Sequence, residues 1–165
     1  MLFLLSAYIF RGSIYRACFS YKLVRLRSEA TPPYALSVTG QDIQGIAEAG
    51  LEGSSALLSF TTGPCATGVP KLQYGGKTNC IGYSNLCAGI CEMKFRANPS
   101  LKDARAETWV AQIFFFGWNV HRLFSDPFWK DHDVVLLTDG AAGDRILLDP
   151  TLYDYTGIGF VRERK

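Results

Sequence analysis

The sequence contains little histidine and cysteine, with two His and five Cys among 165 residues. Five cysteines are few and odd in number, which excludes a small secreted scaffold held together by disulfide bonds. The scarcity of histidine narrows any catalytic hypothesis. Chemistry that needs an imidazole must use His121 or His132.

The chain also lacks a strong charge imbalance, because 17 Lys and Arg residues stand against 15 Asp and Glu, a net charge of +2. This balance gives no reason to expect nucleic acid as the main partner. Hydrophobic residues make up 48% of the sequence and charged residues 19%, which excludes an intrinsically disordered chain. The length predicts one domain with a sizeable core.

The sequence begins with an apolar run that is too short to span a membrane. Residues 1–10 are apolar up to Arg11, whereas a spanning helix needs ~20 such residues. The positive charge follows the run, which is unlike a signal peptide. Residues 1–28 hold no acidic residue and five basic ones, namely Arg11, Arg16, Lys22, Arg25 and Arg27. Two interpretations stay open: a core-packing first element with a solvated basic edge, or peripheral contact of residues 1–28 with an anionic membrane surface.

Thr31-Pro32-Pro33 is the clearest break in the chain, since proline restricts its own backbone and that of the preceding residue. We therefore expect residues 1–30 to be an apolar and basic N-terminal appendage and residues 31–165 to form the main domain. Free-thiol chemistry favours a reducing, cytoplasmic compartment, although the apolar start leaves export open.

Local patterns predict helices before a run of strands. A first helix is expected over residues 41–49, capped by Thr39 or Gly40 and ended by Gly50 and Gly53.

A loop-rich stretch over residues 61–78 precedes a second helix, which Asn79 caps and which runs to about Phe95. Strands are expected over residues 108–120, 131–138 and 145–149. Because no crossover helices separate these strands, the pattern indicates an α+β fold with an antiparallel sheet.

Cys80, His132 and Asp149 occupy positions at the ends of these predicted elements. Cys80 falls in the first turn of a helix, where free N–H groups and the helix dipole favour a thiolate. A two-residue type II′ turn at Gly140-Ala141 would place His132 directly opposite Asp149 on the neighbouring strand. The three residues together predict a nucleophile, its general base and a carboxylate that orients the base.

Structural interpretations of the same residues stay open. Cys87 and Cys91 share a helical stripe with Cys80, and such a stripe usually packs against a sheet; they lack the second ligand pair that a zinc site needs. Asp149 before Pro150 is also typical of a strand that ends in a turn. His121 is expected to be a partly exposed residue at a strand end.

The residues around the three positions resemble a known family. Cys80-Ile81-Gly82-Tyr83-Ser84 resembles the Cys-x-Gly-Tyr-Ala segment of transglutaminase-like cysteine proteases, and Asp149-Pro150-Thr151 resembles their Asp-Pro-Thr strand ending. The stretch from His132 is similar to the strand that carries the family's histidine. The resemblance implies a papain-like α+β core with Cys80 as nucleophile, His132 as general base and then acid, and Asp149 as orienting carboxylate. It implies no cofactor and no metal, and a peptide or protein amide, or a small acyl donor, as substrate.

The sequence departs from the family at the histidine, where His132-Asp133-Val134 replaces the usual His-Ala-Trp. Gly75-Gly76, His132 and Asp149 also resemble arylamine N-acetyltransferases, and a non-catalytic binding protein of the same fold is a third alternative. Aromatic residues near the predicted triad are candidates for substrate binding: Trp129 in the turn before His132, Tyr83 and Tyr153.

Overall fold

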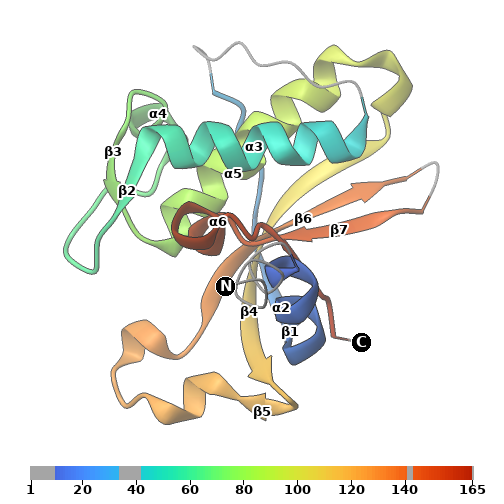
Figure 1. Cartoon of the computed structure of the whole chain (residues 1–165). Coiled ribbons are helices and arrows are strands. Elements are labelled where there is room, and N and C mark those ends of the chain that lie inside the picture. Colours follow the sequence, from blue (N-terminus) through green and yellow to red (C-terminus); the bar gives the residue numbers. More distant parts are fainter. Residues whose placement is uncertain (1–9, 34–41, 141–142, 165) are drawn as a thin grey trace, which may run out of the picture.

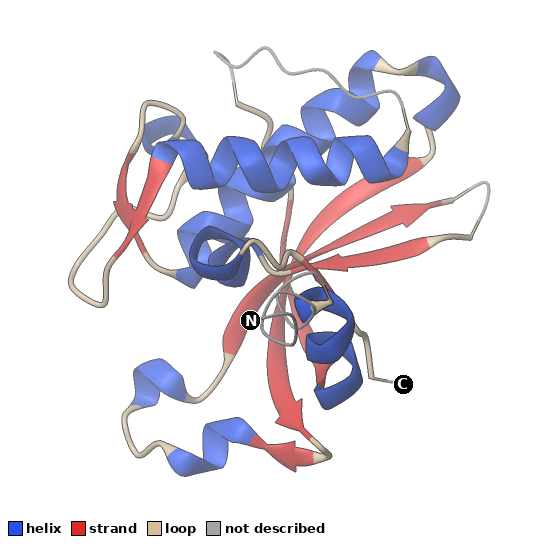
Figure 2. Cartoon of the chain, viewed as in Figure 1, coloured by secondary structure: helices blue, strands red, loops and turns tan. Residues whose placement is uncertain are grey.

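The computed structural model describes residues 10–33, 42–140 and 143–164, which form a mixed α+β fold (Figure 1). Helices and strands alternate irregularly along the chain (Figure 2), in agreement with the α+β class predicted from the sequence. The larger elements are α2 (Arg11–Cys18), β1 (Phe19–Glu29), α3 (Ile43–Leu57), α5 (Cys80–Ala97), β4 (Ala104–Phe115), β6 (His132–Asp139), β7 (Arg145–Leu148) and α6 (Pro150–Thr156). The short ones are β2 (Leu58–Phe60), α4 (Val69–Leu72), β3 (Gly76–Thr78), η1 (Pro99–Leu101), β5 (Trp118–Asn119), η2 (Val120–Leu123), η3 (Pro127–Trp129) and β8 (Phe160–Val161).

The main sheet is antiparallel and runs in the order β1-β4-β6-β7-β8, with β5 paired to the end of β4. The sequence predicted one strand over residues 108–120, and this prediction is wrong at its end. The chain reverses at Phe116 and Gly117, which have φ values of 45° and 87°, and then returns as β5. The hairpin projects from the end of the sheet that lies away from α3 (Figure 1).

Residues 19–29 of the predicted N-terminal appendage are strand β1 of this sheet. Their pairing with β4 runs from Phe19 opposite Phe115 to Glu29 opposite Glu107. Tyr21 in β1 is fully buried. The segment after β8 also returns to Tyr21, whose N–H and carbonyl both pair with it, so the sheet curls back on itself. This strand is therefore part of the main fold.

Helix α3 is longer than the sequence predicted, because Gly50 and Gly53 lie inside it and do not end it. Asp42 caps it by accepting from the N–H of Gly45, while the predicted caps Thr39 and Gly40 lie outside the described residues. A Cβ on Gly50 would approach Cys91 Sγ to 2.5 Å. Gly50 therefore allows α3 to pack closely against α5.

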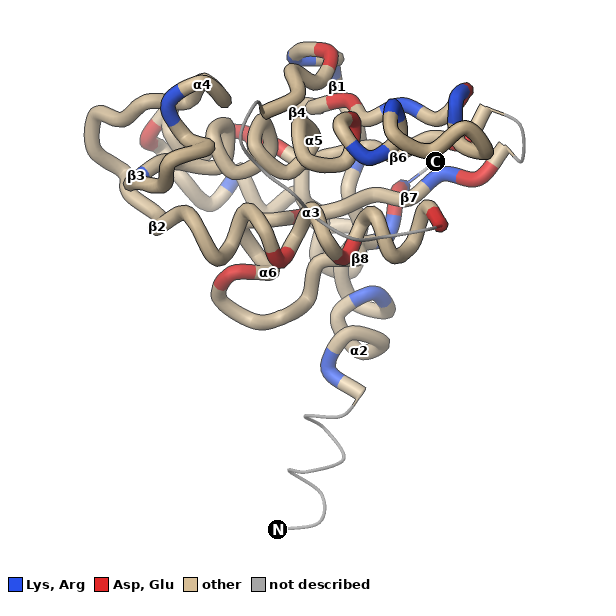
Figure 3. Tube along the Cα trace, turned by 90° about the horizontal axis from the view of Figure 1, so that it is seen from above, with Lys and Arg blue, Asp and Glu red and all other residues tan. Residues whose placement is uncertain are grey.

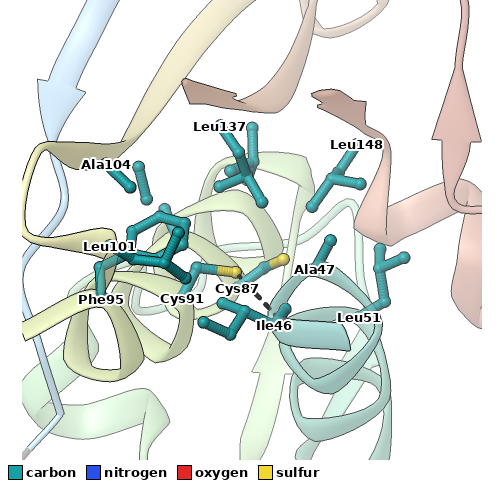
Figure 4. Packing of buried hydrophobic residues seen from close by; sticks show 13 residues of the cluster. Ile46, Ala47, Leu51, Cys87, Cys91, Phe95, Leu101, Ala104, Leu137 and Leu148 are labelled. Atoms are coloured by element: carbon teal, nitrogen blue, oxygen red, sulfur yellow. Dashed lines mark hydrogen bonds between the residues drawn. The ribbon is translucent and has the colours of Figure 1, made fainter. Parts of the chain in front are cut away.

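The main core lies between the sheet and helices α3 and α5, which cover one of its faces (Figure 1). Cys87 and Cys91 are fully buried there, and the Cys91 thiol donates to the Ile46 carbonyl (Figure 4). The interpretation of these two cysteines as packing residues is confirmed. A second core cluster lies around Tyr21 on the other face of the sheet.

The stretch predicted as a loop contains a helical turn, α4, and strand β3. Strand β3 pairs in parallel with β2, forming a separate two-stranded sheet that the sequence did not predict. Strand β3 leads directly into Asn79 and α5, so this small sheet helps to fix where α5 begins. Within the described residues, no helix combines the length and apolar character needed to cross a bilayer.

Candidate active site

Cys80 is the first residue of α5, as the sequence predicted. The side chain of Asn79 caps the helix by accepting from the backbone N–H groups of Ile81 and Gly82. A Cβ on Gly82 would overlap the Thr78 side chain, so the glycine lets this first turn sit against β3. Cys80 itself is partly exposed, unlike Cys87 and Cys91. The local sequence therefore presents one accessible thiol at a helix N-terminus.

His132 begins β6, and its Nε2 lies 3.0 Å from Asp149 Oδ2. The sequence predicted that the two residues are direct strand partners, and this register is wrong. Val135 pairs with Leu148, a register that leaves His132 two residues beyond the position opposite Asp149. A two-residue shift keeps side chains on the same face of a sheet, so the contact survives diagonally. Ala141 of the predicted turn lies outside the described residues.

Asp149 is the N-cap of α6 rather than the last residue of a strand. Its Oδ1 accepts from the N–H of Leu152, and its Oδ2 accepts from the hydroxyl of Tyr21 at 2.8 Å. Burial by itself would raise the pKa of Asp149. The charge of His132 and the hydrogen bonds from His132, Leu152 and Tyr21 together outweigh burial, so the net pKa lies below its ordinary value. The carboxylate is therefore a fixed, ionised partner for His132.

The imidazole of His132 contacts this carboxylate through Nε2, and the Cys80 thiol is a further electrostatic neighbour of the ring. Burial disfavours the charged ring, yet Asp149 and the neighbouring Cys80 raise the pKa of His132 well above its ordinary value. Because Nε2 bonds to Asp149, Nδ1 is the ring nitrogen that remains for the thiol. Residues from α5, β6 and the start of α6 thus come together as the sequence predicted.

The sequence did not place Asp133 or Arg27 in the candidate site, although both belong to it. Asp133 is 1% exposed, and its Oδ2 lies 3.7 Å from Cys80 Sγ. Arg27 in β1 donates from Nε and Nη2 to the two oxygens of Asp133. The unusual His132-Asp133 pair was a visible signal in the sequence. No local pattern pointed to Arg27, which lies 106 residues before Asp133 in the chain.

Two of the three predicted substrate-binding residues have structural contacts elsewhere. Tyr83 is fully buried, and its hydroxyl donates to Asp154 on α6. Tyr153 packs against the main core, and burial, together with Glu52 and Glu48, raises its pKa. Tyr83 is therefore closed off from a substrate, whereas a substrate contact of the partly buried Tyr153 stays a prediction.

Trp129 is 41% exposed and belongs to a group of aromatic rings near the start of α5. Its ring contacts Phe124 and Phe128, and Phe128 in turn meets Phe60. Phe60 pairs with Thr78, two residues before Cys80. Phe60 and Phe128 are therefore candidate substrate contacts that the sequence did not single out, besides Trp129.

His121 is buried, which corrects the expectation of a partly exposed side chain. Its Nδ1 donates to the Trp129 carbonyl at 2.7 Å, because a carbonyl can only accept. Its Nε2 has no hydrogen-bond partner among the described residues. His121 thus anchors the turn that leads to His132.

An open groove of about 910 Å³ lies along β1, β4, β5 and η2. Its walls are mainly aromatic and aliphatic, with cationic side chains from Lys22 and Arg122. Gln112 lines it and directly follows Ala111, the strand partner of His132. The groove and the candidate site therefore share strand β4.

Comparisons with known proteins give no relative for this chain. No protein-family model matches it, and neither the curated proteins nor the solved structures contain a significant match. In the described part of the chain, no group of three or more His, Cys, Asp or Glu residues is placed to hold a metal ion.

Proposed function

We propose that the protein is a thiol-dependent acyl-transfer enzyme with a papain-like core, similar to transglutaminase-like cysteine proteases. Cys80 is the nucleophile, His132 the general base and then acid, and Asp149 the orienting carboxylate. The observation that carries the proposal is the contact of His132 Nε2 with Asp149 Oδ2, while Cys80 Sγ lies 3.7 Å from the carboxylate of Asp133, the residue next to His132.

The reaction follows from the order of these groups. In the neutral form of His132, Nδ1 accepts the Cys80 proton, and the thiolate attacks the carbonyl carbon of an amide or another acyl donor. The oxyanion forms near the N-terminus of α5, where backbone N–H groups and the helix dipole favour negative charge. The tetrahedral intermediate then collapses to a thioester as His132 donates its proton to the leaving group.

Water or an amine completes the cycle by attacking the thioester, with His132 accepting the proton of the attacking group. Water makes the protein a hydrolase of peptide or protein amides, and an amine makes it an acyl transferase. The aromatic groove near β5 favours the second route for a flat aromatic amine, in the manner of arylamine N-acetyltransferases.

The proposal is tested by trapping the thioester with p-nitrophenyl acetate, an activated acyl donor. We expect a burst of p-nitrophenolate and one acetyl group on the peptide that contains Cys80. We expect no burst from Cys80→Ala, and a burst slowed by roughly 10²–10⁴-fold in His132→Ala. Acetylation of Cys65 or Cys18 at an equal rate, or no burst at all, would leave a non-catalytic binding protein as the better interpretation.

The same assay separates the two acceptors. After the burst, adding a primary aromatic amine accelerates turnover and gives the acetylated amine if the protein is an acyl transferase. A hydrolase releases acetate at a rate that the amine does not change.

A further inference from the structure

The Cys80 thiol has a second polar neighbour besides His132, the carboxylate of Asp133. Sγ lies 3.7 Å from Oδ2, within reach of an S–H···O hydrogen bond. Asp133 is almost fully buried, so bulk water does not screen the carboxylate. A bare carboxylate at this position would hold the thiol proton and repel the thiolate.

Arg27 supplies the matching positive charge. Its Nε and Nη2 donate to the two oxygens of Asp133, with Nη2 at 3.2 Å from Oδ2. A two-point contact between a guanidinium and a carboxylate fixes the orientation of both groups. The register of β1 against β4 shifts between Leu26 and Ser28, and an irregularity of this kind re-aims the side chain that lies within it.

Opposing electrostatic effects act on the pKa of the Asp133 carboxyl group. Burial raises its pKa, whereas Arg27 and His132 lower it, and the net pKa lies above the ordinary value. Among the described residues, His132 and Asp133 from β6 are the titratable neighbours of the sulfur that the contacts identify. Arg27 acts on it through Asp133, and Asp149 acts on it through His132. Asp131 adds a further negative charge near Asp133.

We propose that Arg27 and Asp133 form a positioning pair that holds Cys80 Sγ beside His132 and sets the pH at which the thiolate forms. This role rests on the proposed function, since it takes Cys80 as the nucleophile. Asp133 accepts the thiol S–H in the resting state, and the proton then moves to Nδ1 of His132 in its neutral form. Because Arg27 compensates the charge of Asp133, the thiolate faces a paired carboxylate instead of an isolated anion. The pair also gives a physical reason for Asp133 at the position after the catalytic histidine.

The test is the rate of iodoacetamide alkylation of Cys80 from about pH 5 to about pH 9, followed by peptide mapping. Asp133→Asn removes the negative charge but keeps the size and the acceptor oxygen. We expect it to lower the midpoint pH of the alkylation profile by about one unit. Arg27→Met removes the positive charge and should raise the midpoint. The double variant Arg27→Met/Asp133→Asn should return it close to that of the wild type.

The outcomes separate this proposal from the proposed function. If wild-type Cys80 reacts no faster than the partly exposed Cys65, both proposals fail. If wild-type Cys80 reacts fast with a midpoint that depends on His132, but Asp133→Asn leaves that midpoint unchanged or raises it, only the positioning pair is overturned. Thermal unfolding followed by circular dichroism checks that each variant folds. If Arg27→Met does not fold, the midpoint of Asp133→Asn decides alone.

Discussion

Asp149 has two separable roles, because one of its oxygens caps α6 while the other contacts His132. Asn is also a good N-cap, so Asp149→Asn keeps the cap through Oδ1 and removes the charge. The substitution also replaces the oxygen that accepts from His132 and from the Tyr21 hydroxyl, and of these two contacts the one with His132 is the ion pair whose strength varies with pH. Asp149→Ala would remove both the helix cap and the contact with His132, so it does not separate the two roles.

We predict that Asp149→Asn lowers the free energy of unfolding by about 2–4 kcal/mol near pH 5, since it leaves a buried histidine without its charged partner. The pKa of His132 is raised in the folded state, so its stabilisation is complete below about pH 6.5 and is lost as the pH rises through the folded-state pKa. The pKa of Asp149 is lowered, so its stabilisation is present above about pH 4 and is lost as the pH falls through the folded-state pKa. The difference between wild type and variant is thus largest between these limits.

Urea unfolding of both proteins across this pH range measures the effect. Asp42→Asn, at the exposed cap of α3, is a matched control because it changes the same group, which has no ion pair with another described residue. A difference for Asp149→Asn that does not vary with pH would show that the contact with His132 is not an ion pair.

Gly82 controls the position of an entire element, the N-terminus of α5. A Cβ there would overlap the Thr78 side chain and approach Leu72 Cδ1 to 2.9 Å. We predict that Gly82→Ala displaces the first turn of α5, costs about 1–3 kcal/mol of unfolding free energy and slows the alkylation of Cys80. Gly12→Ala in α2 is the control, since among the described residues its Cβ would meet only the flexible end of Arg16, at 3.6 Å. Unchanged stability and unchanged reactivity of Gly82→Ala would contradict this account of the turn.

The elements that carry the site were predictable because their signals are local. Asn79 before Cys80 is a strong N-cap, and the apolar run after His132 has the composition of a buried strand. The limits of α3 were not predictable, because Gly50 serves a close helix contact that only the fold creates. From the sequence alone, such a glycine is interpreted as the end of a helix.

The predicted register between β6 and β7 was wrong because it was derived from an assumed two-residue turn. The connection between the two strands is longer, and this shifts the pairing by two residues. The contact between His132 and Asp149 was still predicted correctly, because an even shift keeps both side chains on one face. The contacts between β1 and the candidate site could not be predicted from local patterns, because residues such as Tyr21 and Asp149 are 128 residues apart in the sequence.

On the scale of the whole molecule, the site joins segments from the two ends of the chain. Tyr21 in β1 contacts Asp149 directly, so β1 is needed for the site as well as for the sheet. Contact of residues 1–28 with a membrane surface stays a prediction. Helix α2 has two basic residues and no acidic residue (Figure 3), as that interpretation requires. None of its side chains is classed as buried. Deletion through residue 28 is unsuitable as a test, because it would also remove most of β1.

The central claim is that this fold activates Cys80 as a nucleophile through His132. The most direct measurement is competitive alkylation by limiting iodoacetamide between about pH 6 and pH 7, below the ordinary pKa of a thiol, with each cysteine peptide quantified. Cys65 and Cys18 are comparably exposed internal references, whereas Cys87 and Cys91 are buried. The account predicts that Cys80 reacts at least about tenfold faster than Cys65, and that His132→Ala abolishes the difference. Equal rates for Cys80 and Cys65 in the wild type, or a preference for Cys80 that survives in His132→Ala, would contradict it.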